Sequence, residues 1–250
     1  TYSNWATPIV PVVEPGKIGI CGDYKVTVNP RAKSDQYPVP KTEDLLATLN
    51  GGVQFTKLDL TGAYHQLLLD EDSRECLTIN THKGLLQPTR LVFGVHMASG
   101  VFQRNMERRL DHVPRTIVRV DDILVTGANT EEHLANLGKV LQIIEDNDLR
   151  LKKEKCKFFM DEVDFLGYKI SSEGVKPIQD KVKPILEAPA PQNVSQVKSF
   201  LGMIQYYHRH LPHLASELEP LHQLLRKGVK WSWEEAQDNA FRAANLRLTT

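Results

Sequence analysis

The chain has 250 residues, of which 41% are hydrophobic and 25% charged, so it can fold into one large domain or two small ones and is not a disordered protein. No apolar run approaches the ~20 residues that cross a bilayer, and three widely spaced cysteines predict reduced thiols without a zinc site. The 31 basic residues balance 31 acidic ones, which argues mildly against a nucleic-acid binder. Locally, however, basic residues crowd positions 150–157, a pattern typical of a phosphate-binding stretch or of an ordinary solvated face.

The N-terminal part of the chain predicts strands and one short helix. Residues 9–13 and 18–20 predict a hairpin around Pro15-Gly16, and residues 42–49 predict a helix capped by Thr42. Residues 55–60 predict a strand. The chain begins without an initiator Met or a signal peptide, which indicates a segment of a longer protein.

Helices and strands alternate in the rest of the chain. Residues 98–110 predict a helix, 117–126 a hairpin interrupted by two acids, and 163–170 one strand. Thr130 is expected to cap a helix whose apolar face is Leu134, Leu137, Val140, Leu141 and Ile144. A last helix after residue 193 is expected to stop before Pro212. Strands mixed with segregated helices predict the α+β class.

Two adjacent acids, Asp121 and Asp122, interrupt an apolar strand run. Neighbouring residues of a regular strand point to opposite faces, so one carboxylate would be buried unless a tight turn places both at an exposed tip. An ordinary Asp-containing hairpin turn gives the same pattern. Apolar flanks around paired carboxylates favour a divalent cation, because hard cations prefer oxygen ligands.

Asp59 is a third acid inside an apolar strand, and small residues, Gly62 and Ala63, follow it. Alone, Asp59 is more typical of a strand end. Together with Asp121 and Asp122 it can hold two metal ions ~3.5–4 Å apart for in-line phosphoryl transfer. Small residues let backbone amides approach a phosphate.

The chain resembles the reverse transcriptases of gypsy-type LTR retrotransposons, which are related to retroviral polymerases. The resemblance covers nearly the whole chain and rests on the order and spacing of short motifs. They include Trp5-Ala6-Thr7-Pro8, Cys21-Gly22-Asp23-Tyr24, Lys57-Leu58-Asp59-Leu60, Gly62-Ala63-Tyr64-His65-Gln66, Phe93-Gly94, Phe102-Gln103, Val120-Asp121-Asp122-Ile123-Leu124, Phe165-Leu166-Gly167 and Ser199-Phe200-Leu201-Gly202.

The resemblance implies a right-hand polymerase fold, with fingers and palm in residues 1–170, and thumb and the start of a connection in 171–250, ending before RNase H. It implies an RNA-directed and DNA-directed DNA polymerase that uses two Mg²⁺ ions, or Mn²⁺, held by Asp59, Asp121 and Asp122. Expected partners are a primed RNA or DNA template, deoxynucleoside triphosphates, and the RNase H and integrase regions of a longer polyprotein. No membrane partner is expected, and the expected location is cytoplasmic, within a virus-like particle.

The resemblance also implies roles for individual residues. Gly62, Ala63 and Tyr64 fall where the family binds the nucleotide, with Tyr64 excluding a 2′-hydroxyl, and Phe93 and Gly94 line the same pocket. The alternative for Tyr64 is a core tyrosine on a strand face, and the alternatives for Phe93 and Gly94 are core packing and a turn. Primer and template contacts are implied for Phe165, Leu166 and Gly167 and for the helix face Lys198, Gly202 and Tyr206. Gly202 fits close approach of a nucleic acid or of another helix.

Several positions depart from the family pattern, among them the hairpin tip Glu14-Pro15-Gly16, Val92 and Ser99. Arg119 replaces a tyrosine before the paired acids, where a cation competes with metals, and Gly19 replaces an arginine that grips the triphosphate. Pro88 falls where a strand is expected, and proline removes a ladder hydrogen bond. The leading hypothesis is a polymerase. One alternative is an impaired relic that only binds nucleic acid, and another is a metal-free interaction domain.

Overall fold

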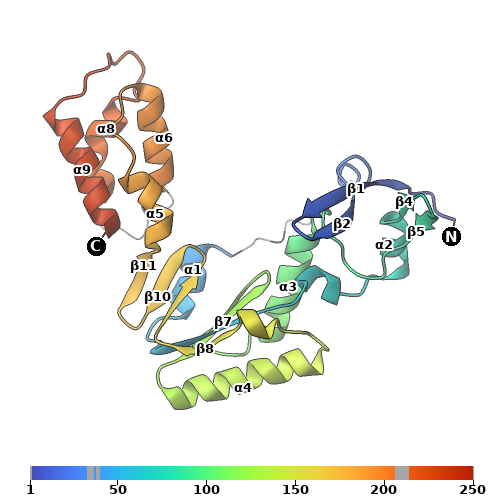
Figure 1. The fold of residues 1–250 in the computed structure, drawn as a ribbon. Helices are drawn as coiled ribbons and strands as arrows, with labels where there is room; N and C mark the ends of the chain where they lie inside the picture. The colour runs from blue at the N-terminus through green and yellow to red at the C-terminus, as the bar shows by residue number, and fades with distance from the viewer. Residues whose placement is uncertain (1, 33–36, 38–39, 206–213, 250) are drawn as a thin grey trace. The chain divides into compact units, whose positions relative to one another are not determined.

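The computed structural model describes residues 2–32, 37, 40–205 and 214–249. They form two compact units, Thr1–Asp161 and Glu162–Thr250 (Figure 1). The functional boundary that the sequence predicts after residue 170 stays a prediction. Within the described residues, no helix is long and apolar enough to cross a membrane.

The first unit contains a distal sheet, a central sheet and the helices that pack on them. In chain order its elements are β1 Thr7–Glu14, β2 Lys17–Gly22, α1 Thr42–Thr48, β3 Gln54–Asp59, the 3₁₀ helix η1 Ala63–Gln66, α2 Glu71–Cys76, β4 Ile79–Thr81, β5 Gly84–Leu86, α3 Ala98–Leu110, β6 Thr116–Arg119, β7 Asp122–Gly127, α4 Thr130–Asp146, the 3₁₀ helix η2 Lys153–Lys155 and β8 Lys157–Met160.

The distal sheet has the strand order β2-β1-β4-β5. Its β1–β2 hairpin confirms the predicted one and pairs Val13 with Ile18 near the tip. Both side chains are exposed, and β2 is an edge strand of this sheet. Pro88, expected in a strand, instead lies in the loop after β5, where its missing N–H removes no ladder bond.

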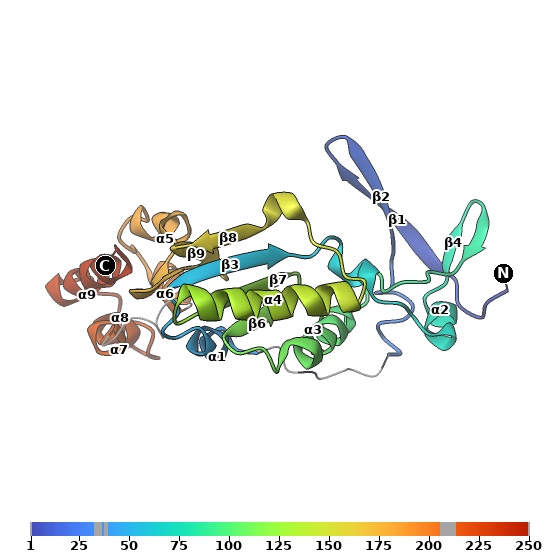
Figure 2. The ribbon, with the colours of Figure 1, turned by 90° about the horizontal axis from the view of Figure 1, so that it is seen from below.

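The central sheet is antiparallel, with the order β6-β7-β3-β8. Apolar side chains at alternate strand positions, such as Leu58, Ile123 and Val125, point to the face covered by α3 and α4. Figure 2 shows α4 lying along this face beside α3. Phe102 and Met106 of α3 and Val140 of α4 complete a fully buried core. The core holds the ends of β3 and β7 in place.

Two predicted helix caps are each wrong by one residue. Thr42 is the first residue of α1, and the cap position, Lys41, has no side-chain capping bond. In α4, Asn129 rather than Thr130 is the cap, because the Asn129 side chain accepts a hydrogen bond from the Glu132 amide at 2.8 Å.

The buried face of α4 also differs from the prediction. Leu134 and Leu141 are 54% and 38% exposed, while the polar residues His133 and Asn136 are buried. The reason is hydrogen bonding. His133 Nε2 lies 2.9 Å from the Thr56 hydroxyl, and the Asn136 amide donates to the Thr126 carbonyl at 3.0 Å. A polar side chain with a partner can take a core position.

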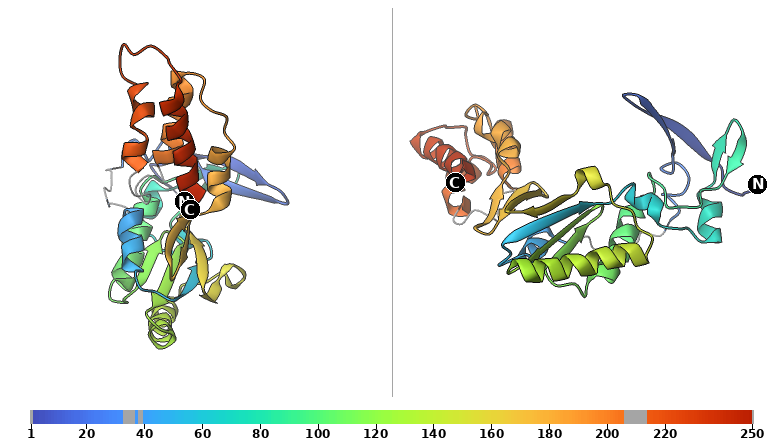
Figure 3. Two further views of the ribbon diagram at one scale, coloured as in Figure 1. Left: turned by 90° about the vertical axis from the view of Figure 1, so that its left-hand side faces the viewer. Right: turned by 60° about the horizontal axis from the view of Figure 1, so that its bottom comes forward.

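The second unit joins a three-stranded sheet to a helical bundle, shown in two views in Figure 3. Residues 163–170 form a hairpin rather than one strand, because Leu166 and Gly167 both adopt positive φ and reverse the chain. The rings of Phe200 and Phe241 lie 4.7 Å apart in the bundle core, tilted by 45° to one another. The end predicted before Pro212 lies outside the described residues. The elements are β9 Glu162–Phe165, β10 Tyr168–Ser171, β11 Gly174–Pro177, α5 Gln179–Leu186, α6 Val194–Gln205, α7 Leu214–Glu217, α8 Glu219–Gln223 and α9 Glu235–Thr249.

Candidate active site

Three carboxylates meet at one end of the central sheet. Asp59 is the last residue of β3 and lies directly opposite Asp122, the first residue of β7. Val120 and Asp121 form the two-residue turn between Arg119 and Asp122. The Asp121 carbonyl accepts a hydrogen bond from the Leu60 amide at 2.9 Å, which ties the turn to β3. The predicted tight turn thus keeps both adjacent acids out of the core.

The turn is held in an unfavourable conformation. Val120 has φ of +52°, a region that a β-branched residue rarely adopts. Its amide donates to the side-chain oxygen of Gln103 at 2.8 Å, and the Gln103 amide donates to the Val118 carbonyl at 2.7 Å. Because Gln103 is fully buried, these bonds fix the turn that carries Asp121.

Charge repulsion is built into the site. Although Asp121 is an exposed residue, loss of water around its carboxyl raises its pKa, and the charges of Asp122 and Asp59 raise it further. Lys155 acts in the opposite direction on Asp121 and pairs with Asp59 at 3.4 Å. Lys57 pairs with Asp122 at 3.1 Å. The two lysines partly neutralise the carboxylates.

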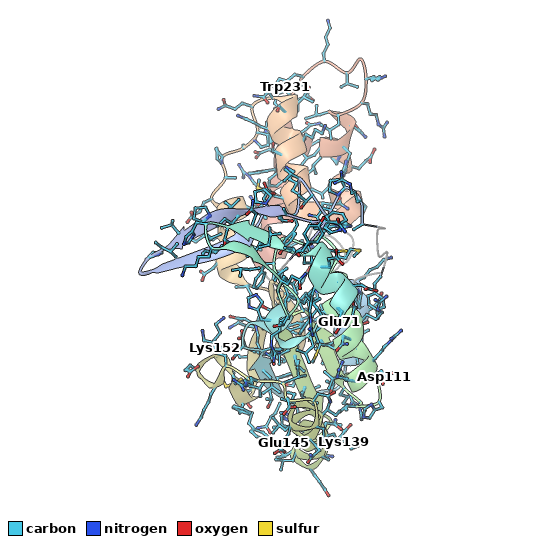
Figure 4. All side chains as sticks on the ribbon, turned by 90° about the vertical axis from the view of Figure 1, so that its right-hand side faces the viewer. Glu71, Asp111, Lys139, Glu145, Lys152 and Trp231 are labelled. Atoms are coloured by element: carbon cyan, nitrogen blue, oxygen red, sulfur yellow. The ribbon has the colours of Figure 1, made fainter. Side chains whose placement is uncertain are left out.

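A cavity of about 450 Å³ opens beside the carboxylates. One wall is the segment that leads into η2, from which Lys152 projects (Figure 4). The cavity therefore places cations opposite acids, an arrangement suited to a metal-bound polyphosphate. Its lining residues are Asp59, Leu60, Thr61, Gly62, Asp121, Leu151, Lys152, Lys153, Glu154 and Lys155.

The donor set fits a divalent cation in its chemistry. Among the residues that the structure describes, no group of three or more His, Cys, Asp or Glu side chains already has the spacing of a metal site. Carboxylate oxygens are nevertheless the ligands that Mg²⁺ prefers, and Asp59, Asp121 and Asp122 come together at one sheet end. These three residues would hold the metal.

The predicted nucleotide residues lie on η1 and next to it. Gly62 takes a left-handed φ of +54° and precedes Ala63, which is buried. The Tyr64 ring lies 5.0 Å from the ring of Phe93 and 5.7 Å from that of Phe102. Burial raises the pKa of Tyr64, and the charge of Asp121 raises it further. Tyr64 is therefore within electrostatic reach of the carboxylates.

Gly94 has a structural requirement of its own. Its φ is +89°, and a Cβ there would lie 3.2 Å from the Gly22 carbonyl. The residue joins the Phe93 loop to the distal sheet, so a plain turn explains it as well as ligand binding does.

The predicted primer and template residues belong to the second unit. Phe165 is buried, and Leu166 and Gly167 form the β9–β10 turn. Lys198 and Gly202 lie on an exposed face of α6, and a Cβ on Gly202 would meet no described atom within 4 Å. Helix packing by the described residues therefore does not account for Gly202. Tyr206 lies outside the described residues.

Two positions that depart from the family pattern, Arg119 and Gly19, have different surroundings. The Arg119 guanidinium donates to the Pro40 carbonyl at 3.1 Å. A Cβ on Gly19 would make only ordinary contacts with Val12, at 3.8 and 3.9 Å, so a larger side chain fits the backbone there.

Several residues of the site were not assigned roles from sequence. Lys57 and Lys155 pair with the carboxylates, and Gln66 and Gln103 fix the loops that carry site residues. The glutamines stand inside recognised motifs, but only the fold shows which backbone groups they reach.

Comparison with known proteins defines the class. Residues 23–170 match the family model described as reverse transcriptase (RNA-dependent DNA polymerase). The chain therefore belongs to the reverse transcriptase family.

Its relatives include the Tf2-7 and Tf2-3 transposon polyproteins of Schizosaccharomyces pombe (strain 972 / ATCC 24843), each 31% identical over 227 residues, which is 90% of this chain. These matches confirm the resemblance to gypsy-type LTR retrotransposons. The chain spans 17% of the length of these relatives.

Solved structures confirm the polymerase fold. The foamy viral protease-reverse transcriptase dRH in complex with double-stranded DNA matches with a TM-score of 0.80 and 23% identity, covering 99% of this chain and 44% of that one. The foamy viral protease-reverse transcriptase in complex with an RNA/DNA hybrid matches with a TM-score of 0.74 and 22% identity, covering 100% and 34%.

Proposed function

We propose that this chain is the polymerase region of a retrotransposon polyprotein and extends a primer 3′-hydroxyl on an RNA or DNA template. The observation that supports this most strongly is the meeting of Asp59, Asp121 and Asp122 beside a lysine-lined cavity in a chain of the reverse transcriptase family.

The three aspartates would hold the divalent metal, with Mg²⁺ as the expected ion and Mn²⁺ as a substitute. Bound there, the metal would supply activation of the attacking hydroxyl and stabilisation of charge on the transferred phosphate. The protein's own groups position the nucleotide. Backbone amides at Gly62 and Ala63 face the triphosphate, and the lysines of the cavity wall offset its negative charge.

Tyr64 selects between the deoxyribose and ribose forms of the incoming nucleotide. Its ring packs against the rings of Phe93 and Phe102, which limits its movement. A ring fixed under the sugar leaves no space for a 2′-hydroxyl, so deoxynucleotides are selected sterically.

Primer and template are assigned to Phe165, Leu166, Gly167, Lys198, Gly202 and Tyr206, and to the basic stretch 150–157. The solved neighbours with double-stranded DNA and with an RNA/DNA hybrid support duplex binding, and the polyprotein relatives support a longer natural chain. RNase H and integrase regions and a cytoplasmic virus-like particle complete the proposal, with fingers and palm in 1–170 and thumb in 171–250.

The direct test is extension of a primed homopolymer with Mg²⁺ and then with Mn²⁺, with Asp121→Asn as the inactive control. Extension by the parent and none by the variant is the expected result.

An impaired relic has one observation in its favour, since Gly19 offers no side chain to a triphosphate. A relic binds primer–template tightly at low salt without extending it, whereas an interaction domain shows flat, weak binding.

A further inference from the structure

Gln66 uses its whole side-chain amide to join two distant segments. Its NH₂ group donates to the Thr61 carbonyl at 2.6 Å and to the Arg150 carbonyl at 3.0 Å. Its oxygen accepts from the Arg150 amide at 2.6 Å. Thr61 and Arg150 stand 89 positions apart in the numbering (150 − 61), so these bonds are tertiary contacts.

The two segments that Gln66 joins are residues 59–61, which begin with Asp59, and residues 150–152, which pair with them. The Asp59 carbonyl accepts from the Lys152 amide at 2.8 Å, and the Thr61 amide donates to the Arg150 carbonyl at 2.9 Å. Leu60 and Leu151 form an isolated antiparallel bridge between them. Residues 59–61 and 150–152 thus continue the sheet as a short two-stranded extension past Asp59, and the Gln66 amide closes its far end.

The loop that Gln66 closes has little packing at its start, at Thr61 and Gly62. Gly62 and Thr61 are exposed, and a Cβ on Gly62 would meet only the His65 ring, at 4.0 Å. The Arg90 guanidinium adds bonds to the carbonyls of His65 and Gln66, at 3.1 and 3.2 Å. Hydrogen bonds rather than side-chain burial therefore fix the exposed start of the loop, Thr61 and Gly62, whereas Ala63 and Tyr64 also pack against the core.

We propose that Gln66 is a positioning residue that fastens the nucleotide loop, Thr61 to Tyr64, to the lysine-bearing segment 150–155. This inference rests on the proposed function for its kinetic consequence. Gln66 touches no reacting atom. It sets where the Gly62 and Ala63 amides and the Tyr64 ring stand relative to Asp59, because all of them lie within the loop that it closes.

Two substitutions separate hydrogen bonding from volume. Gln66→Met keeps nearly the same side-chain length but loses all three hydrogen bonds. Gln66→Ala loses the hydrogen bonds and the side-chain volume as well. Gln142→Ala is the matched control, because Gln142 is exposed on α4 and donates only to Asp146, one helical turn away, at 2.8 Å. Melting curves show whether each variant folds.

The kinetic measurement is single-nucleotide extension with each deoxynucleotide and its ribonucleotide. Both Gln66 variants are expected to raise KM for the deoxynucleotide by roughly tenfold or more, the scale of one lost hydrogen bond or several, and to lower deoxy-to-ribo selectivity. A merely destabilised protein loses active enzyme and so lowers kcat, leaving KM and selectivity where they were.

Amide hydrogen exchange of residues 60–67 and 149–153 gives a readout that needs no activity. Faster exchange in both Gln66 variants and not in Gln142→Ala supports the inference. Unchanged exchange, or Gln66→Met behaving as the parent in KM and selectivity, overturns it. A parent that extends no primer refutes the proposed function separately, and the exchange result then still decides whether Gln66 fastens the loop.

Discussion

Asp59 and Asp122 face each other directly across the β3–β7 ladder, as cross-strand partners of like charge. Such pairs destabilise a sheet by a few tenths to about 1 kcal/mol relative to neutral pairs. Lys155 and Lys57 offset part of that repulsion. A sheet end that would be more stable without its acids is typical of a site kept for chemistry.

This relationship predicts opposite effects on stability and activity. Asp122→Asn removes one of the two facing charges, so the free energy of unfolding should stay unchanged or rise by up to about 1 kcal/mol. Primer extension should fall by at least ~10³-fold, because metal binding stabilises the transition state by several kcal/mol. Urea denaturation and extension assays check the two halves. Asp111→Asn, an exposed acid at the end of α3, should change neither. Near-parental primer extension by the Asp122→Asn protein would show that Asp122 is not a metal-binding residue.

Tyr64→Ala is expected to admit ribonucleotides. Removing the ring opens the space beneath the sugar, so the steric penalty against a 2′-hydroxyl disappears. The measurement is the ratio of kcat/KM values for a deoxynucleotide and its ribonucleotide. Tyr64→Phe keeps the ring and its contacts with Phe93 and Phe102, and should keep the parent's ratio. An unchanged ratio in an active Tyr64→Ala protein would show that Tyr64 does not exclude the 2′-hydroxyl.

Gly19→Arg and Arg119→Tyr should improve the enzyme in different ways. An arginine at position 19 should lower KM for nucleotide by roughly 10- to 150-fold, the range of a charge-assisted phosphate contact of about 1.5–3 kcal/mol. Arg119→Tyr should lower the metal requirement, while losing the bond to Pro40 should reduce stability by about 1 kcal/mol. Steady-state extension by the parent, both single variants and the double is the test. A parent as active as the double shows that both departures are tolerated.

His133 predicts a pH dependence of stability. Burial lowers the pKa of His133 in the folded state below the unfolded value of about 6.5. The unfolded chain therefore binds more protons below that pH, so stability is full above about pH 6.5 and falls as the pH drops toward the folded pKa. His133→Gln removes this loss and can still hydrogen-bond to Thr56. The check is urea denaturation between pH 8 and pH 5. Equal pH slopes for the two proteins would refute the assignment.

Periodicity and motif spacing predict most of the fold and its carboxylates. The apolar runs around Asp59 and Asp122 specify β3 and β7, and the helix at 98–110 is found with its predicted bounds. The misses have local physical causes. His133 takes a core position where an apolar residue is expected, because it is hydrogen-bonded there. Leu166 adopts a positive φ, which a leucine in the sequence does not indicate. Contacts between distant segments, such as Gln66 with Arg150, leave no local pattern to detect.

The β1–β2 hairpin has a consequence for handling the protein in solution. Val13, Ile18 and Ile20 are 75%, 72% and 64% exposed, and β2 has a neighbour only on its β1 side. An apolar strand with a free row of backbone donors and acceptors is a template on which another chain can add a strand. At the concentrations needed for crystals or spectra, the protein is therefore expected to associate edge to edge through β2, and a single charge at Ile18 should keep it monodisperse.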